Sequence, residues 1–154
     1  MEKQFEIFRK TRAYLLSIVD ELTVEQLNTV PQGFNNNIIW NFGHVIAAQQ
    51  GVCYKRGGLP MLIEEGLFNN YKPESKPENK VEENEIQRLK GLLFSTIDDL
   101  EKDYKANKFT GYIPWKTRYG VEINNIEEAI TFLSFHDGLH IGYTMALRRV
   151  VSNK

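Results

Sequence analysis

The sequence has little cysteine and no excess of charge of either sign. Its single cysteine, Cys53, cannot form an internal disulfide, so an intermolecular one is the only disulfide left open. Lys and Arg together number 19 and Asp and Glu 20, which gives a net charge of -1. There is no surplus of positive charge to neutralise phosphates. We therefore expect no nucleic-acid partner.

Long hydrophobic runs are also missing. The first residues, Met1 to Glu6, are already charged, and they lack the apolar stretch of a signal peptide or membrane span. This predicts a cytoplasmic protein with no membrane partner.

No His or Asp lies within a helical turn of Cys53 to activate it, so we interpret this residue as part of the packing.

The chain also contains no internal repeat and no low-complexity tract. Its 154 residues, of which 42% are hydrophobic and 25% charged, are enough to bury one core. We expect a single domain over residues 1–154.

Apolar residues recur at spacings of three and four in four segments, which predicts helices over residues 3–22, 38–54, 82–104 and 125–151. The second is apolar on nearly all sides and should be the most buried, although Ile38 and Ile39 alone would also suit a strand. Thr23 and Gln26 form the pattern of a capping box for a short extra turn. The predicted fold class is all-α, an up-down four-helix bundle with long connections after helices 2 and 3.

Those two connections are rich in turn-forming residues. Residues 57–80 contain glycines, prolines and asparagines at high density, and such a loop either covers a site or serves as a surface crossover. The segment 109–123 indicates a loop or small hairpin around Arg118, Tyr119 and Gly120.

The three histidines carry the strongest functional signal. His136 and His140 are four residues apart on one predicted helix, so both imidazoles can reach one metal ion. Two partly exposed, hydrogen-bonded histidines are the alternative. His44 lies within the most apolar helix, where a buried imidazole needs a partner. If the second and fourth helices adjoin, His44 supplies a third nitrogen and leaves one position for water or substrate.

Other candidates near this site are less specific. The side chain of Asp137 points about 100° around the helix axis from that of His136. Asp137 either supports a metal ligand or faces solvent. Asn41 and Gln49 are possible wall residues, with exposure favoured for Gln49. Gly138 and Gly142 would allow a second helix to approach closely.

Three segments carry a family resemblance: residues 22–28 (Leu-Thr-Val-Glu-Gln-Leu-Asn), residues 39–44 (Ile-Trp-Asn-Phe-Gly-His), and residues 136–142 with Leu147-Arg148-Arg149. The chain resembles the DinB-like superfamily over most of its length. The resemblance implies a divalent zinc, nickel or iron ion on His44, His136 and His140. It also implies a homodimer, with contacts from apolar residues on the first or third helix and with the long loop as a further candidate.

The resemblance further suggests a transferase that acts with a low-molecular-weight thiol on small electrophiles. Thiol-cofactor enzymes of this superfamily include bacillithiol transferases and mycothiol-dependent maleylpyruvate isomerase. A metal-dependent hydrolase is one alternative, and a stress-related binding protein whose metal is structural or absent is another. Catalytic and thiol-binding residues are not indicated. Because only neutral imidazole binds metal, affinity should fall steeply below about pH 6, given ordinary histidine pKa values near ~6.5.

Overall fold

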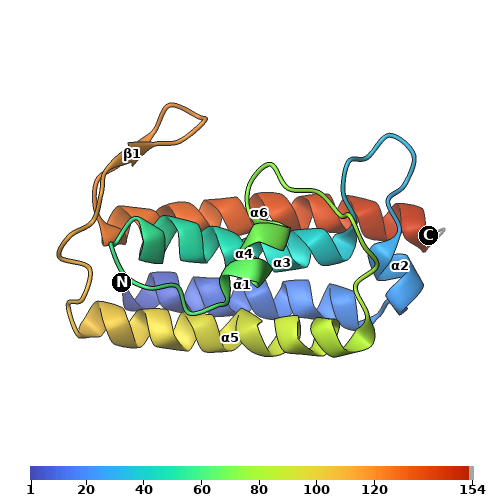
Figure 1. The fold of residues 1–154 in the computed structure, drawn as a ribbon, viewed down its shortest axis with the longest axis horizontal. Helices are drawn as coiled ribbons and strands as arrows, with labels where there is room; N and C mark the ends of the chain where they lie inside the picture. Colours follow the sequence, from blue (N-terminus) through green and yellow to red (C-terminus); the bar gives the residue numbers. More distant parts are fainter. Residues whose placement is uncertain (153–154) are drawn as a thin grey trace.

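Four long helices form the body of the computed structural model, which describes residues 1–152. They lie side by side (Figure 1) and are α1 (Glu2–Asp20), α3 (Ile38–Gln49) continued by the π-helix η1 (Gln50–Lys55), α5 (Glu83–Lys105) and α6 (Ile126–Val151). The smaller elements are α2 (Val24–Asn28), α4 (Glu65–Tyr71) and a hairpin of β1 (Trp115–Lys116) and β2 (Glu122–Ile123). The mostly helical class predicted from the sequence is confirmed.

Side-chain caps fix where the helices begin. The hydroxyl of Thr23 accepts from the amide of Gln26, whose side chain accepts from the amide of Thr23, so the predicted capping box is present. Asn37 and Asn125 cap α3 and α6 by accepting from backbone amides three residues later. Such caps satisfy free amides of the first turn. They set the start of both histidine-bearing helices.

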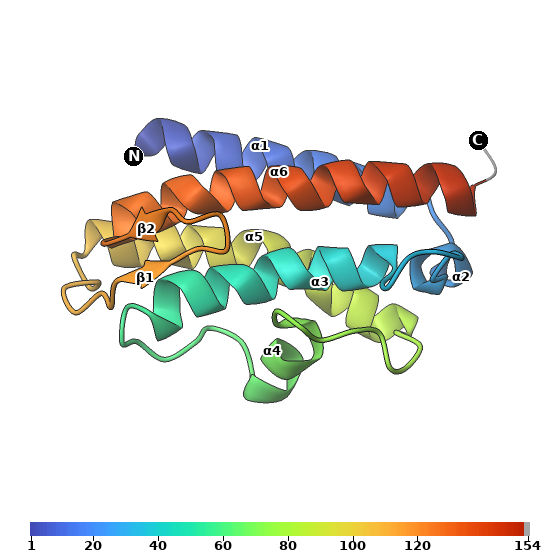
Figure 2. The ribbon, with the colours of Figure 1, turned by 90° about the horizontal axis from the view of Figure 1, so that it is seen from above.

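The long helices do not alternate in direction. Figure 1 and Figure 2 show α1 and α6 running one way along the bundle and α3 and α5 running the other way. The up-down order expected from the sequence is therefore not confirmed, because the consecutive helices α3 and α5 are parallel. Residues 56–82 are long enough to cross the bundle from the end of α3 to the start of α5, with α4 on the outside.

Helix α3 is the most buried element, as predicted. All of its residues are buried, and it packs against α4, α5 and α6. Gly43 permits part of this packing, because a Cβ atom there would overlap the ring of Tyr71 from α4. Gly138 and Gly142 do not have the expected role: both are exposed, and a Cβ atom at either would meet no neighbour.

The continuous helix formed by α3 and η1 changes its winding where η1 begins. The amide of Arg56 donates to the carbonyl of Gly51, five residues back, so the turn is wider than in an α-helix. Cys53 on this segment is buried and free of disulfides, which agrees with a packing role, and burial raises the pKa of its thiol.

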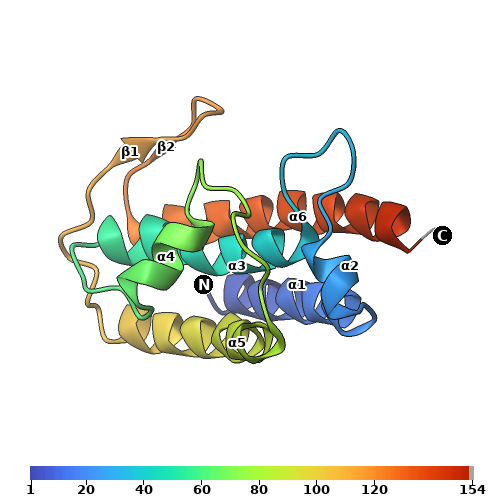
Figure 3. The ribbon, with the colours of Figure 1, turned by 45° about the vertical axis from the view of Figure 1, so that its right-hand side comes forward.

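One side of the bundle is covered by irregular chain. The β1–β2 hairpin, the crossover with α4, and the segment before α3 all rise on the same side of the α3–α6 layer (Figure 3). Within the described residues, no helix has the length and apolar character needed to cross a membrane.

Candidate metal centre

The structure brings the three histidines together, as predicted. His44 on α3 meets His136 and His140 on α6, and one nitrogen from each ring lies within 4.8 Å of the others. The ring centroids of His44 and His136 are 5.2 Å apart, and those of His140 lie 4.5 and 4.6 Å from His44 and His136. Metal–nitrogen bonds are about 2.0 to 2.1 Å, so these imidazoles are in reach of one ion.

The backbone of α4 orients His44. Its Nδ1 lies 2.6 Å from the carbonyl oxygen of Tyr71 and donates to it, which leaves Nε2 as the free nitrogen. The indole of Trp40 stacks on the imidazole with ring centroids 4.7 Å apart. The ring of His44 is therefore held on two sides before any ion binds.

An asparagine on α3 orients His140. Nδ1 of His140 donates to Oδ1 of Asn41 at 2.8 Å. The amide group of Asn41 in turn donates to Oδ1 of Asn36 and to the carbonyl of Asn37, so its own orientation is fixed. Asn41, predicted as a possible wall residue, instead supports a candidate ligand, as hydrogen-bond acceptors commonly do in metal sites.

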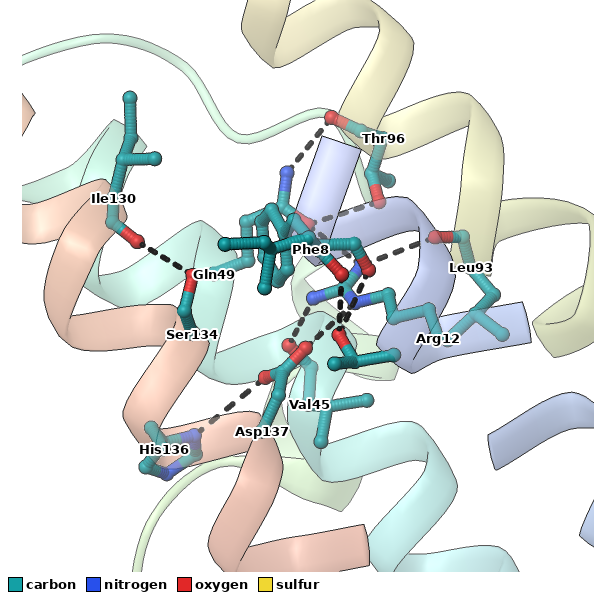
Figure 4. Close-up of polar contacts among 12 residues, drawn as sticks. Phe8, Arg12, Val45, Gln49, Leu93, Thr96, Ile130, Ser134, His136 and Asp137 are labelled. Carbon is teal, nitrogen blue, oxygen red and sulfur yellow. Dashed lines mark hydrogen bonds and ion pairs between the residues drawn. The ribbon is translucent and has the colours of Figure 1, made fainter. Parts of the chain in front are cut away.

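The third histidine faces a carboxylate that is not yet bonded to it. Nδ1 of His136 lies 3.8 Å from Oδ1 of Asp137, and neither atom has a hydrogen-bond partner within residues 1–152 (Figure 4). A donor and an acceptor thus face each other just beyond bonding distance. This pair fits a metal site, because a carboxylate that accepts from Nδ1 of a ligand histidine leaves Nε2 of that ring to the ion.

Asp137 itself belongs to a buried polar network, also drawn in Figure 4. Nε of Arg12 donates to Oδ2 of Asp137, and its other nitrogens donate to Oε1 of Gln49 and the carbonyl of Val45, each at 2.9 Å. Arg12, Gln49 and Asp137 are fully buried. The solvent-facing alternative for Asp137 and the expected exposure of Gln49 are both wrong, because Arg12 supplies the partner that each needs. In the sequence, this buried role of Arg12 is indicated by its position within the apolar stripe of the first predicted helix.

Burial keeps two of the histidines neutral. It lowers the pKa of His44 to about 4, with a further contribution from the neighbouring His136. Burial also lowers the pKa of His140 to about 2, assisted by His44 and His136. At neutral pH these two rings are thus in the state that binds metal.

The triad opens onto a cavity of about 560 Å³. Its aromatic walls come from α3, the crossover, the hairpin and α6: Trp40, Phe68, Trp115 and Phe132. Three cationic side chains, Lys55, Arg56 and Arg118, also line it. No further His, Cys, Asp or Glu joins the triad among residues 1–152. A site with three ligands and an open side suits catalysis better than a purely structural role.

Comparison with known proteins agrees with this arrangement. Residues 7–144 match the family model described as the DinB superfamily, and the match includes all three histidines. No curated protein matches the chain.

Proposed function

This chain belongs to the DinB superfamily, and on that premise we propose that it is a metal-dependent transferase that joins a low-molecular-weight thiol to small electrophilic molecules. His44, His136 and His140 are the proposed ligands of a divalent zinc, nickel or iron ion. When bound, such an ion lowers the pKa of a thiol that coordinates to it.

The observation that carries the proposal is the open triad at the floor of an aromatic cavity. Tyr71 and Asn41 hold two of the imidazoles through Nδ1, which leaves the other nitrogen of each ring available to an ion shared with His136. The aromatic walls provide contact area for the apolar part of an electrophile. In the transfer, the thiol gives up its proton to solvent, its sulfur forms a bond to the electrophilic carbon, and the leaving group departs with the electron pair of the broken bond.

The direct test uses 1-chloro-2,4-dinitrobenzene and 2-mercaptoethanol, which yield a thioether and chloride. Zinc- or nickel-loaded protein should accelerate thioether formation, and the acceleration should disappear with a chelator. His44→Ala should abolish it. Tyr54→Phe is the matched control, because Tyr54 lies buried on the same continuous helix but bonds to Asp103 instead of the triad. Equal rates with and without chelator would refute the proposal.

A metal-dependent hydrolase would use the same open position for water. It would release p-nitrophenol from p-nitrophenyl acetate with metal but without any thiol, whereas the proposed transferase requires the thiol. Elemental analysis of protein purified without an affinity tag identifies the native metal for both assays.

A further inference from the structure

Three positively charged side chains share the cavity with the triad. Lys55 and Arg56 follow one another at the end of η1, and Arg118 lies on the β1–β2 hairpin. Within residues 1–152, none of the three forms an ion pair. By contrast, Arg9 and Arg88 on outer faces of the bundle each pair with carboxylates. The cavity therefore holds three positive charges that form no ion pair with a carboxylate of the described residues.

Aromatic rings hold two of these cations in place. The ammonium group of Lys55 lies 4.3 Å from the centroid of the Phe68 ring, and the guanidinium of Arg56 lies 5.4 Å from that of Trp115. Cation–π contacts of this kind position a charge without neutralising it. Both groups are thus kept at the wall and remain free to bind an anion.

Arg118 lines the cavity from the β1–β2 hairpin, whereas Lys55 and Arg56 lie at the end of η1. Arg118 and the three histidines line the same cavity, so its positive charge acts on the triad and adds to the lowering of the pKa of His44 and His140 by burial and by the neighbouring imidazoles. Its side chain is exposed on a hairpin that stands outside the bundle core. The bundle does not need Arg118 for packing.

Negative charge in the cavity wall is sparse. Glu74 is the one carboxylate among the described residues that line the cavity, against three cations. A low-dielectric cleft lined by one sign of charge attracts ligands of the other sign. A bound divalent ion would add to this field.

From this arrangement we propose that Arg118, with Lys55 and Arg56, forms a subsite for the carboxylate of a small organic ligand. The aromatic walls take the apolar part of that ligand. This inference deepens the proposed function, since it names the substrate class of the same site. The carboxylate belongs either to the thiol or to the electrophile.

The chain carries its own reporter for binding. Its two tryptophans, Trp40 and Trp115, both line the cavity, so intrinsic fluorescence measures occupancy without turnover. Metal-free protein should bind phenylacetate about tenfold more tightly than the uncharged phenylacetamide, as expected for one charge-assisted hydrogen bond. Arg118→Ala should remove this preference. Lys116→Ala should keep it, because it deletes the same charge from the same hairpin at an exposed position outside the cavity.

Equal binding of the acid and the amide by the wild-type chain would overturn the proposal. An unchanged preference in Arg118→Ala would do the same. Circular dichroism of both variants checks the fold, which the exposed positions should leave intact. Added salt should weaken phenylacetate binding and leave phenylacetamide binding unchanged.

A second arm identifies which molecule carries the carboxylate. Zinc-loaded protein is titrated with mercaptoacetate and with 2-mercaptoethanol, again by fluorescence. A preference for mercaptoacetate that depends on Arg118 assigns the carboxylate to the thiol, and equal affinities assign it to the electrophile. Because neither arm requires turnover, an inactive protein that still prefers carboxylates would refute the transferase proposal alone.

Discussion

Nε of Arg12 lies 2.9 Å from Oδ2 of Asp137, and both side chains are fully buried. This ion pair joins α1 to α6 immediately beside His136. Removing one partner leaves an uncompensated charge in the core. We therefore expect Arg12→Met to lower the free energy of unfolding by about 3 to 5 kcal/mol, measured by urea denaturation.

The double variant Arg12→Met/Asp137→Asn should recover part of that loss, because it removes both charges. Arg9→Ala is the control on the same helix. Its partners Asp98 and Glu101 lie nearer the surface, so its effect should stay below about 1 kcal/mol. A double variant that is no more stable than Arg12→Met alone would contradict this account.

Asn41 should control metal affinity through His140. Asn41→Ala removes the acceptor of the Nδ1 hydrogen bond, and loss of such a partner typically costs about 10- to 100-fold in metal affinity. Asn41→Asp keeps an acceptor oxygen for His140 but loses the amide group that donates to Asn36 and Asn37, so it should restore only part of the affinity. The measurement is zinc competition against a chromophoric chelator. Unchanged affinity in Asn41→Ala would show that this contact is purely structural.

The stoichiometry of metal binding tests the triad as a unit. Wild-type protein should bind one divalent ion per chain, and His44→Ala, His136→Ala and His140→Ala should each weaken that binding, because each removes one of three ligands. Isothermal titration calorimetry with zinc measures both quantities. A variant with wild-type affinity would exclude its histidine from the site.

The helices and the triad could be predicted from the sequence because their signals are local. Apolar spacing and caps placed each long helix within about two residues of its observed ends. His136 and His140 share a helix face by spacing alone. His44 followed from the cost of burying an imidazole without a partner.

The remaining features depend on contacts between distant segments. Nothing local fixes the path of residues 56–82, so the parallel course of α3 and α5 was not predicted. The burial of Gln49 requires Arg12 from α1 and Thr96 from α5 as partners. Gly43, and not Gly138, lies against a close neighbour, the ring of Tyr71.

The metal-free chain should lose stability as the pH falls below about 6.5. In the unfolded chain His44 and His140 have ordinary pKa values near ~6.5, whereas burial lowers them to about 4 and about 2 in the fold. Between pH 6.5 and 4 the unfolded state therefore binds more protons. Each histidine should reduce the free energy of unfolding by up to about 1.4 kcal/mol per pH unit.

The double variant His44→Gln/His140→Gln should reduce the dependence of the free energy of unfolding on pH between pH 6.5 and 5. Ordinary carboxylates titrate below this range, so they do not set the slope there. Urea denaturation at several pH values gives the comparison, and equal slopes would contradict it. The sequence predicted that protons compete with the metal ion for these histidines below about pH 6. For His44 and His140, as proposed ligands, the lowered pKa values move this competition to about pH 4 and below.

Cys53 should take no part in thiol chemistry. Burial raises the pKa of its thiol, and its side chain has no exposed surface. Native protein should react with Ellman's reagent only after denaturation, and Cys53→Ser should keep full transferase activity. Rapid labelling of the native protein would place the thiol in an accessible position and overturn this interpretation.

The wide turn of η1 lets one wall of the cavity absorb a change in chain length. An α-helix rotates by about 100° per residue, and a π-turn accommodates one additional residue within its loop of hydrogen bonds. Deleting Val52 would therefore return the segment to α-helical winding, while Lys55 and Arg56 keep their direction around the helix axis. Loss of a single codon at this position would thus leave both the cations and the histidines in place, whereas the same loss within the α-helical part of α3 would turn every residue that follows it.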